Sequence, residues 1–175
     1  TTKLILQTTF QFDSSKTTET AATLETKVSN ALISFNDDTL GQFEGMFRHS
    51  KVTGLIDDVD TAITGNITNV TLAHDLTPTI GTATSYTIQL NNKFYNPHDG
   101  HNKISGGIVA STGFKISGDT TNEMFFDDDG SGNLRIYYIV AGVRVYQSST
   151  AGTVDYANGK ITVGSVNIAT ISNVD

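Results

Sequence analysis

The segment from Phe47 to Leu72 changes its hydrophobic period part-way along, and this constrains the fold more than any other feature. Its first half places apolar residues at helical spacing, and its second half alternates apolar residues with threonine and asparagine. A change from a period of about 3.6 to about 2 marks the junction of a helical segment with a β-rich one. The residues at helical spacing are Val52, Leu55, Ile56 and Val59, and those at strand spacing are Ile67, Val70 and Leu72.

Length and charge limit the classes of protein to consider. The chain has 175 residues, no cysteine and a formal net charge of −7. This length suits one domain, or a small piece joined to a medium one, with a core that needs no disulfide bonds. The excess of acidic residues argues against nucleic acid as a partner. A signal-peptide pattern and a run of about 18 apolar residues are both absent from the sequence, so we expect no membrane partner.

The N-terminal part predicts one strand followed by two helices. We expect a strand at 3–12, a helix at 18–36 capped by Thr17 or Thr18 and ended by Asn36, and a short helix at 49–59. A single strand cannot complete a sheet, so its partners should lie upstream in a longer protein or downstream near Phe43 to Phe47. The chain begins at Thr1 without methionine, which also suggests a fragment or a processed chain.

The remainder predicts short strands separated by turns. Threonine suits strands, and glycine and asparagine suit turns. Gly65-Asn66 is a predicted turn, Asp129–Asn133 joins two aromatic-rich strands, and Asn158-Gly159 is the strongest hairpin signal. Strands are expected at 67–76, 84–91, 93–96, 107–110, 113–117, 123–128, 133–141, 143–147, 152–156, 160–164 and 166–171.

These elements predict an α+β chain with two parts. The first, residues 1–62, is a short strand-helix-helix segment that forms part of a larger α/β domain. The second, residues 63–175, is a β-rich, mainly antiparallel domain.

Two loops resemble metal sites. His98, Asp99 and His101 are possible zinc or iron ligands, and a metal-dependent hydrolase would use them. Because protein metal sites usually take three or four ligands and no further one presents itself, we interpret this segment as a polar loop. The other loop begins like a calcium-binding EF-hand, but Tyr138 stands where its closing glutamate should be, so we interpret it as a hairpin turn with solvated acids. Its remaining template positions are Asp127, Asp129, Ser131 and Gly132.

Charged residues flank the short helix. Paired carboxylates at Asp57-Asp58 and Asp60 can act as acid and base only in a cleft that separates their pKa values, so we expect them to face solvent or end the helix. Positive charge near the helix start opposes the helix dipole, which hints at a partner that supplies the complement. The residues that carry this charge are Arg48, His49 and Lys51.

The remaining motifs predict no chemistry. Ser105-Gly106-Gly107 lacks the lysine of a phosphate loop, and Gly164-Ser165-Val166 lacks the second glycine of a nucleophile elbow. Phe125-Phe126 and Tyr137-Tyr138 alternate faces, so one residue of each pair should be core and the other is available for a sugar or a protein. We therefore expect no enzyme activity, no cofactor, and no catalytic, cofactor-binding or metal-binding residues.

Three segments carry a family resemblance: FRHSKVTGLIDDVDTAITGNITNVTL, NNKFYNPHDGHN and FFDDDGSGNLRIYY. Together they resemble the C-terminal part of the baseplate wedge protein, of the baseplate-J-like kind, of T-even-like contractile-tailed bacteriophages. TTETAATLETKVSNALISFNDDTLGQF and GTVDYANGKITV are also similar to that family.

The resemblance implies a structural subunit in the virion tail baseplate, assembled in the host cytoplasm. Its partners would be copies of itself in the same and neighbouring wedges and other baseplate wedge proteins, which it joins into a ring around the tail hub. The alternative is a β-rich receptor- or carbohydrate-binding module of a virion, which the threonine-rich strands and aromatic pairs would also suit.

Overall fold

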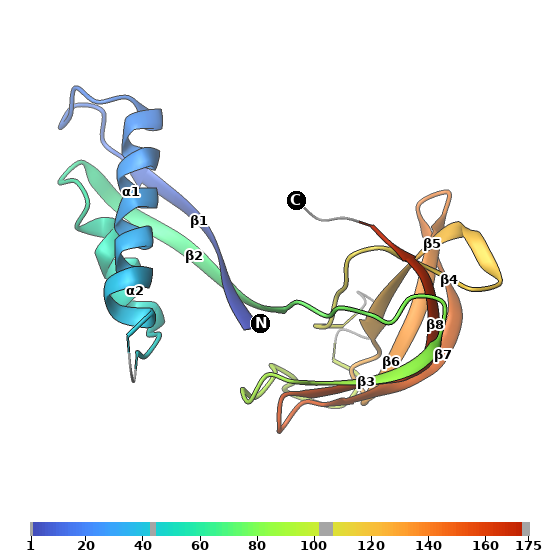
Figure 1. The fold of residues 1–175 in the computed structure, drawn as a ribbon. Helices are drawn as coiled ribbons and strands as arrows, with labels where there is room; N and C mark the ends of the chain where they lie inside the picture. Colours follow the sequence, from blue (N-terminus) through green and yellow to red (C-terminus); the bar gives the residue numbers. More distant parts are fainter. Residues whose placement is uncertain (1, 43–44, 102–106, 173–175) are drawn as a thin grey trace. The chain divides into compact units, whose positions relative to one another are not determined.

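The computed structural model describes residues 2–42, 45–101 and 107–172 (Figure 1). The chain forms two compact units, and we call Lys3–Ala73 the N-terminal unit and His74–Asp175 the C-terminal unit. The α+β class is confirmed, because a strand and two helices precede a mainly antiparallel β region. The domains 1–62 and 63–175 stay a prediction, and the strand that begins at Ile63 pairs inside the N-terminal unit.

The N-terminal unit is a two-stranded ribbon with helices on one face. Thr8 Oγ1 lies 3.0 Å from Thr68 Oγ1, and Thr64 Oγ1 donates to the Gln11 carbonyl at 3.2 Å, so the strands run antiparallel (Figure 1). A core of Val28, Val52, Ile56 and Ile63 joins the helices to Leu6, Phe10 and Phe12 of the first strand. The elements are β1 (Thr2–Phe12), α1 (Ala21–Phe35), a π-helical turn (Asn36–Leu40), α2 (His49–Asp57) and β2 (Ile63–His74).

Local hydrogen bonds explain where the first helix begins and ends. Its N-cap is Thr20, whose hydroxyl accepts from the Thr23 amide, so the predicted caps Thr17 and Thr18 are wrong. The α-helix ends at Phe35 with Asn36 as its C-cap, as predicted, and a π-helical turn follows from Asn36 to Leu40.

Two further expectations for this unit are corrected. The partner of β1 is β2, which is downstream but lies well past the predicted 43–47; of that segment, Phe43 and Glu44 are outside the described residues. The predicted turn at Gly65-Asn66 lies within β2. The Asn66 side chain donates to the Thr53 carbonyl at 2.9 Å and to Asp57 Oδ1 at 2.7 Å, so its amide holds α2 against the strand.

The C-terminal unit is a small antiparallel barrel with one added strand. Its strand order is β3-β8-β4-β5-β6-β7, and β7 also pairs with β8, so the ladder from β4 to β8 closes on itself. The strands are β3 (Ala83–Gln89), β4 (Phe114–Ile116), β5 (Asp119–Asp128), β6 (Asn133–Val140), β7 (Val143–Asp155) and β8 (Lys160–Ile171).

One long strand makes this closure possible. The first part of β8 pairs with β7, with Val163 opposite Gly152, and its last part pairs with β4, with Ile168 opposite Ile116. The barrel interior is filled by apolar side chains from all five strands. They are Phe114, Met124, Phe126, Leu134, Ile136, Val154, Val163, Val166 and Ile168.

Strand lengths in this unit differ from the prediction. The predicted pair 143–147 and 152–156 is one strand, β7, and the pair 160–164 and 166–171 is one strand, β8. The hairpin at Asn158-Gly159 is confirmed. Residues 93–96 and 107–110 form no strand, although Phe94 and Val109 pack against the core. Their amides form hydrogen bonds outside any strand ladder: the Phe94 amide donates to the Tyr156 carbonyl, and the Val109 amide donates to the Asp128 side chain.

Candidate functional site

The histidine loop holds two imidazoles together without a third ligand. His101 Nδ1 lies 3.2 Å from His98 Nε2, and the exposed Tyr95 ring meets His101 edge-on. Across residues 2–42, 45–101 and 107–172, no three His, Cys, Asp or Glu side chains are grouped to hold a metal. The histidine pair therefore forms part of a surface loop, and the loop contacts the β5–β6 turn, where Gly100 N donates to the Gly130 carbonyl at 3.1 Å.

The three consecutive aspartates at the end of β5 perform three separate tasks. Asp127 faces outward from the barrel, Asp128 binds the segment around Ile108, and Asp129 closes the β5–β6 turn. Asp127 and Asp129 therefore do not converge on one point, as the calcium-loop template would require. Their oxygens are already occupied by protein donors.

Asp128 is fully buried, and backbone amides and a tyrosine hydroxyl donate hydrogen bonds to its two carboxylate oxygens. Its Oδ1 accepts from the amides of Ile108 and Val109, both at 2.7 Å, and its Oδ2 accepts from the Tyr156 hydroxyl at 2.6 Å and the Gly130 amide at 3.2 Å. Burial and the hydrogen bond to Asp128 raise the pKa of Tyr156 above its ordinary value. This carboxylate ties an irregular segment and the last hairpin to the barrel.

Asp129 shapes the turn into β6. Its Oδ1 accepts from the amides of Ser131 at 2.8 Å and Asn133 at 3.0 Å, and its Oδ2 accepts from Asn133 Nδ2 at 2.7 Å. Partial burial raises the pKa of Asp129, but the hydrogen bonds from Asn133 and Ser131 outweigh it, so the pKa is lowered overall. The loop that resembles a cation site is thus a turn stabilised by its own aspartate.

Asp127 organises a cluster on the outer face of β5, β6 and β7. The side chain is 1% exposed, and it accepts from Arg135 Nε at 2.8 Å, Arg144 Nη1 at 2.7 Å and the Tyr146 hydroxyl at 3.1 Å. Arg135 lies over the Tyr146 ring at 4.3 Å, and Arg144 lies over the Tyr137 ring at 4.5 Å. We call Asp127, Arg135, Tyr137, Arg144 and Tyr146 the outer cluster.

One residue of each predicted aromatic pair lies on the face that carries the outer cluster. Phe126 and Tyr138 pack on the core, whereas Phe125 stacks on Tyr137 at 5.6 Å on the other face, which confirms the predicted alternation. The arginines were missed, although the sequence carries a signal for them. Arg135-Ile-Tyr137 and Arg144-Val-Tyr146 repeat the same spacing on adjacent strands, and a period of about 2 puts each arginine and tyrosine on one face.

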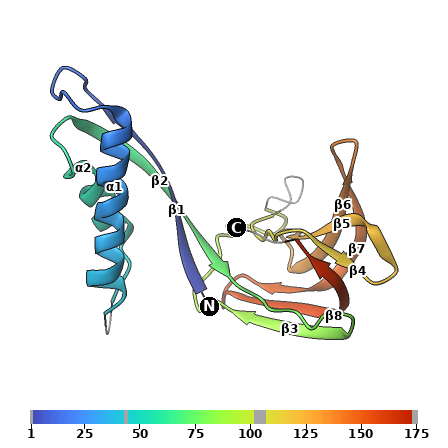
Figure 2. The same cartoon turned by 45° about the horizontal axis from the view of Figure 1, so that its top comes forward.

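Beyond the outer cluster, the β6–β7 hairpin extends past the rest of the barrel (Figure 2). It carries exposed apolar side chains. Val140 pairs with Val143 and Tyr138 pairs with Val145. Val140 is 50% exposed and Val143 is 65% exposed. We call Ile139, Val140, Val143 and Val145 the hairpin tip, where exposed apolar side chains gather on one element.

Two of the acids near α2, Asp57 and Asp60, bind separate partners within the N-terminal unit. Asp60 accepts from the Ala62 amide at 3.0 Å and from Lys27 Nζ at 3.1 Å, and these two bonds lower its pKa. Asp57 accepts from Asn66. At the other end of the helix, the ring of His49 lies 2.8 Å from the Thr68 carbonyl, so it joins α2 to β2.

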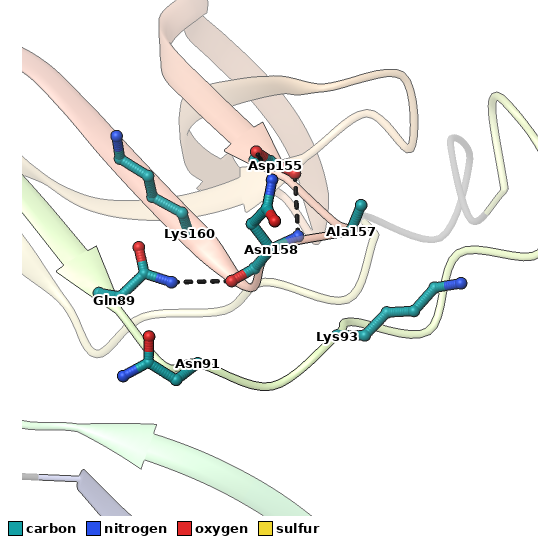
Figure 3. A pocket seen from close by; sticks show the side chains of 7 residues that line it. All are labelled: Gln89, Asn91, Lys93, Asp155, Ala157, Asn158 and Lys160. Carbon is teal, nitrogen blue, oxygen red and sulfur yellow. Dashed lines mark hydrogen bonds between the residues drawn. The ribbon is translucent and has the colours of Figure 1, made fainter.

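The barrel also has a shallow polar hollow of about 550 Å³ (Figure 3). Gln89 Nε2 donates to the Asn158 carbonyl at 2.8 Å, and Asn158 Nδ2 donates to Asp155 Oδ2 at 2.7 Å. The side chains of Lys93 and Lys160 lie at its rim. None of the lining residues is aromatic, so the hollow has no ring on which a sugar can stack.

Two remaining sequence motifs have no functional geometry among the described residues. Ser105 and Gly106 lie outside the described residues, and Gly164-Ser165-Val166 runs inside β8. No helix in the described part of the chain combines the length and apolar character needed to cross a membrane.

The ribbon of the N-terminal unit has an uncovered face. Ile5 is 52% exposed and Ile67 is 70% exposed, while their neighbours Leu6 and Thr68 face the helices. As far as the structure describes the chain, β1 and β2 form a sheet of two strands, so each strand has one edge without a partner strand. Exposed apolar residues beside open strand edges are features of a surface that assembles with other proteins.

Comparison with known protein families gives a match over the N-terminal unit. Residues 4–75 match the family described as baseplate structural protein gp6, C-terminal domain III, and this segment nearly coincides with the N-terminal unit. Comparison with curated proteins finds no match. The match supports a structural role for the chain in a phage tail baseplate, within the virion and among other baseplate subunits.

Proposed function

We propose that the chain belongs to a baseplate wedge protein of the baseplate-J-like kind and joins neighbouring wedges into a ring around the tail hub. Its partners are copies of itself in the same and neighbouring wedges and other wedge proteins, and assembly takes place in the host cytoplasm. The observation that carries the proposal is the baseplate match over the N-terminal unit, whose ribbon has an uncovered face.

The ribbon supplies the physical reason for self-association. A two-stranded sheet is only marginally stable by itself, and this one is covered by helices on a single face. Packing Ile5 and Ile67 against another subunit removes apolar surface from water, and an added strand satisfies an open edge. Both effects favour the assembled state.

Ring closure places a further demand on such contacts. A closed ring needs the same contact repeated with fixed geometry, which a rigid β scaffold provides. A ring that rearranges when a tail contracts needs contacts with two discrete arrangements rather than one adhesive surface.

The test is the mass of the purified chain as a function of concentration, measured by sedimentation velocity. We expect the average mass to rise with concentration, and the double variant Ile5→Asp/Ile67→Asp to remain monomeric because it places two charges in the contact. Ile33→Asp is the matched control, since Ile33 is 57% exposed on α1. A constant monomer mass for the unmodified chain, or an equal effect of the control, contradicts the proposal; a specific glycan ligand without self-association favours the binding-module alternative.

A further inference from the structure

The β6–β7 hairpin has two faces with different chemistry. Cross-strand pairing places Tyr137 opposite Tyr146 and Ile139 opposite Arg144 on the outer face. The other face carries the pairs Tyr138–Val145 and Val140–Val143. Tyr138 on this second face packs against the barrel core, so the row of apolar residues continues the core-facing side of the sheet beyond the end of the core.

This apolar row has no cover within the described residues of the barrel. Val140, Val143 and Val145 are 50%, 65% and 37% exposed, and Ile139 on the other face is 54% exposed. Exposed apolar side chains gathered on one projecting element mark a contact surface, whereas single ones scattered over a protein do not.

The charge around the hairpin tip indicates the character of its partner. Between residues 136 and 150 the sequence has one charged residue, Arg144, and no acid. Behind the tip, Asp127 balances only one of the two guanidinium groups that bind it, Arg135 and Arg144, so these three residues have a net charge of +1 in a chain of net charge −7. The Arg144 side chain is 37% exposed and can meet a carboxylate of a partner.

Contacts within the outer cluster restrict the arginine side chains behind the hairpin tip. Arg144 is fixed between the Asp127 carboxylate and the Tyr137 ring, and Arg135 is fixed against Tyr146. Tyrosine and arginine are the residues that contribute most strongly to protein interfaces, and side chains that are already ordered lose little entropy on binding.

We propose that the hairpin tip inserts into an apolar groove with an acidic rim on a different protein of the tail. A second copy is the poorer fit, because a two-fold contact between tips would bring two Arg144 side chains together without an acid from residues 136–150. The hollow lined by Gln89 and Asn158 is also polar, as is a second hollow near Glu19 and Asp60 in the N-terminal unit, and neither matches an apolar tip. This inference rests on the proposed function only in placing the partner in the tail.

The test uses a photo-reactive amino acid at Val140 of the chain in assembled phage particles, followed by mass spectrometry of the cross-linked peptides. The matched control position is Ile80, which is 51% exposed in the same unit. We expect Val140 to cross-link to a peptide of another tail protein that carries apolar side chains and an aspartate or glutamate, and Ile80 to give little product.

Variants at Arg144 test the charge argument independently of the apolar contact. Arg144→Glu should lower the Val140 cross-link yield about tenfold, whereas Arg144→Lys should retain most of it. Near-ultraviolet circular dichroism of both variants checks that the barrel is folded.

The outcomes separate this inference from the proposed function. Particles that never contain the chain overturn the proposed function and this inference with it. Particles that contain the chain, but in which Val140 links only to another copy or no more than Ile80 does, overturn the hairpin contact alone.

Discussion

The Tyr156 hydroxyl donates a 2.6 Å hydrogen bond to a carboxylate oxygen of Asp128, whose side chain is fully buried. Replacing Tyr156 with phenylalanine removes this donor and leaves part of a buried charge unsatisfied, which costs about 1–3 kcal/mol in the free energy of unfolding. Urea denaturation of both proteins measures the difference. Tyr95→Phe is the control, since Tyr95 is exposed. An equal loss of unfolding free energy in that variant would contradict a stabilising role for the buried hydrogen bond.

The same bond predicts sensitivity to alkali. Burial and Asp128 raise the pKa of Tyr156 from its ordinary value of 10.0, so the folded chain keeps the proton that the unfolded chain releases first. The resulting stability is complete below pH 10 and is lost as the pH rises above it. Thermal melts between pH 8 and pH 11 should show a shallower fall for Tyr156→Phe, with a residual slope from Tyr146, whose pKa burial also raises. Identical slopes would contradict this.

The outer cluster predicts an order among three substitutions. Asp127→Ala leaves Arg135 with its largely buried guanidinium unpaired, and Arg135→Ala leaves the buried carboxylate short of donors. Asp127→Ala should cost about 3–5 kcal/mol, because breaking a buried ion pair strands a charge. Arg135→Ala should cost less, because Arg144 and the Tyr146 hydroxyl still bind the carboxylate. Arg144→Ala should cost about 1 kcal/mol or less, because this side chain is 37% exposed and screened by solvent. Guanidinium chloride denaturation ranks the three, and equal losses would refute the assigned burial.

Alanine substitutions at two glycines with similar positive φ values can distinguish the cost of backbone strain from the cost of steric crowding. Gly130 and Gly142 have φ values of 74° and 81°, which side-chain-bearing residues rarely adopt. A Cβ at Gly130 would collide with the His101 backbone, whereas one at Gly142 meets nothing within 4 Å. Gly142→Ala should therefore cost about 1 kcal/mol, and Gly130→Ala clearly more. Similar melting temperatures for the two variants would show that the loop around His101 does not pack closely on the turn.

Two aspartates, Asp119 and Asp155, are bound in the same way by an asparagine three residues later, and this arrangement predicts sensitivity to acid. Asp119 accepts from both the amide and the side chain of Asn122, and Asp155 does the same with Asn158, which lowers the pKa of each aspartate below 3.8. The stability gained is present above that value and lost as the pH falls below it. Asp119→Asn and Asp155→Asn should each flatten the acid limb of a stability–pH profile, measured by urea midpoints from pH 2 to pH 6. Asp99→Asn, in the histidine loop, is the comparison.

The sequence predicted those features that depend on neighbours along the chain. The two helices follow from apolar spacing, and the last hairpin follows from Asn158-Gly159. The pairing of β1 with β2 could not be predicted in this way. About fifty residues separate the two strands, and no local sequence pattern indicates which later strand pairs with β1. The predicted turn at Gly65-Asn66 failed for the same reason, because pairing with β1 keeps these two residues extended within β2.

Side-chain partners explain the other differences. In the sequence, Asp127, Asp128 and Asp129 form one acidic run. In the structure the strand turns them to different sides, and each has its own partner. Asp127 binds Arg135, Asp128 binds Tyr156 and Asp129 binds Asn133. Ser148 to Gly152 resembles a loop in composition, yet pairing with β6 and β8 keeps β7 continuous through it. Tertiary context decided both cases.

The position of β8 has a consequence for biosynthesis. This strand bonds to β3, β4 and β7, and it is the last of the strands to leave the ribosome. Until Ile171 has emerged, β7 and β4 each have an open edge, and the apolar interior remains accessible to water and to other nascent chains. The C-terminal unit therefore completes its folding only at the end of its own translation, whereas the N-terminal unit can fold once residue 73 has emerged.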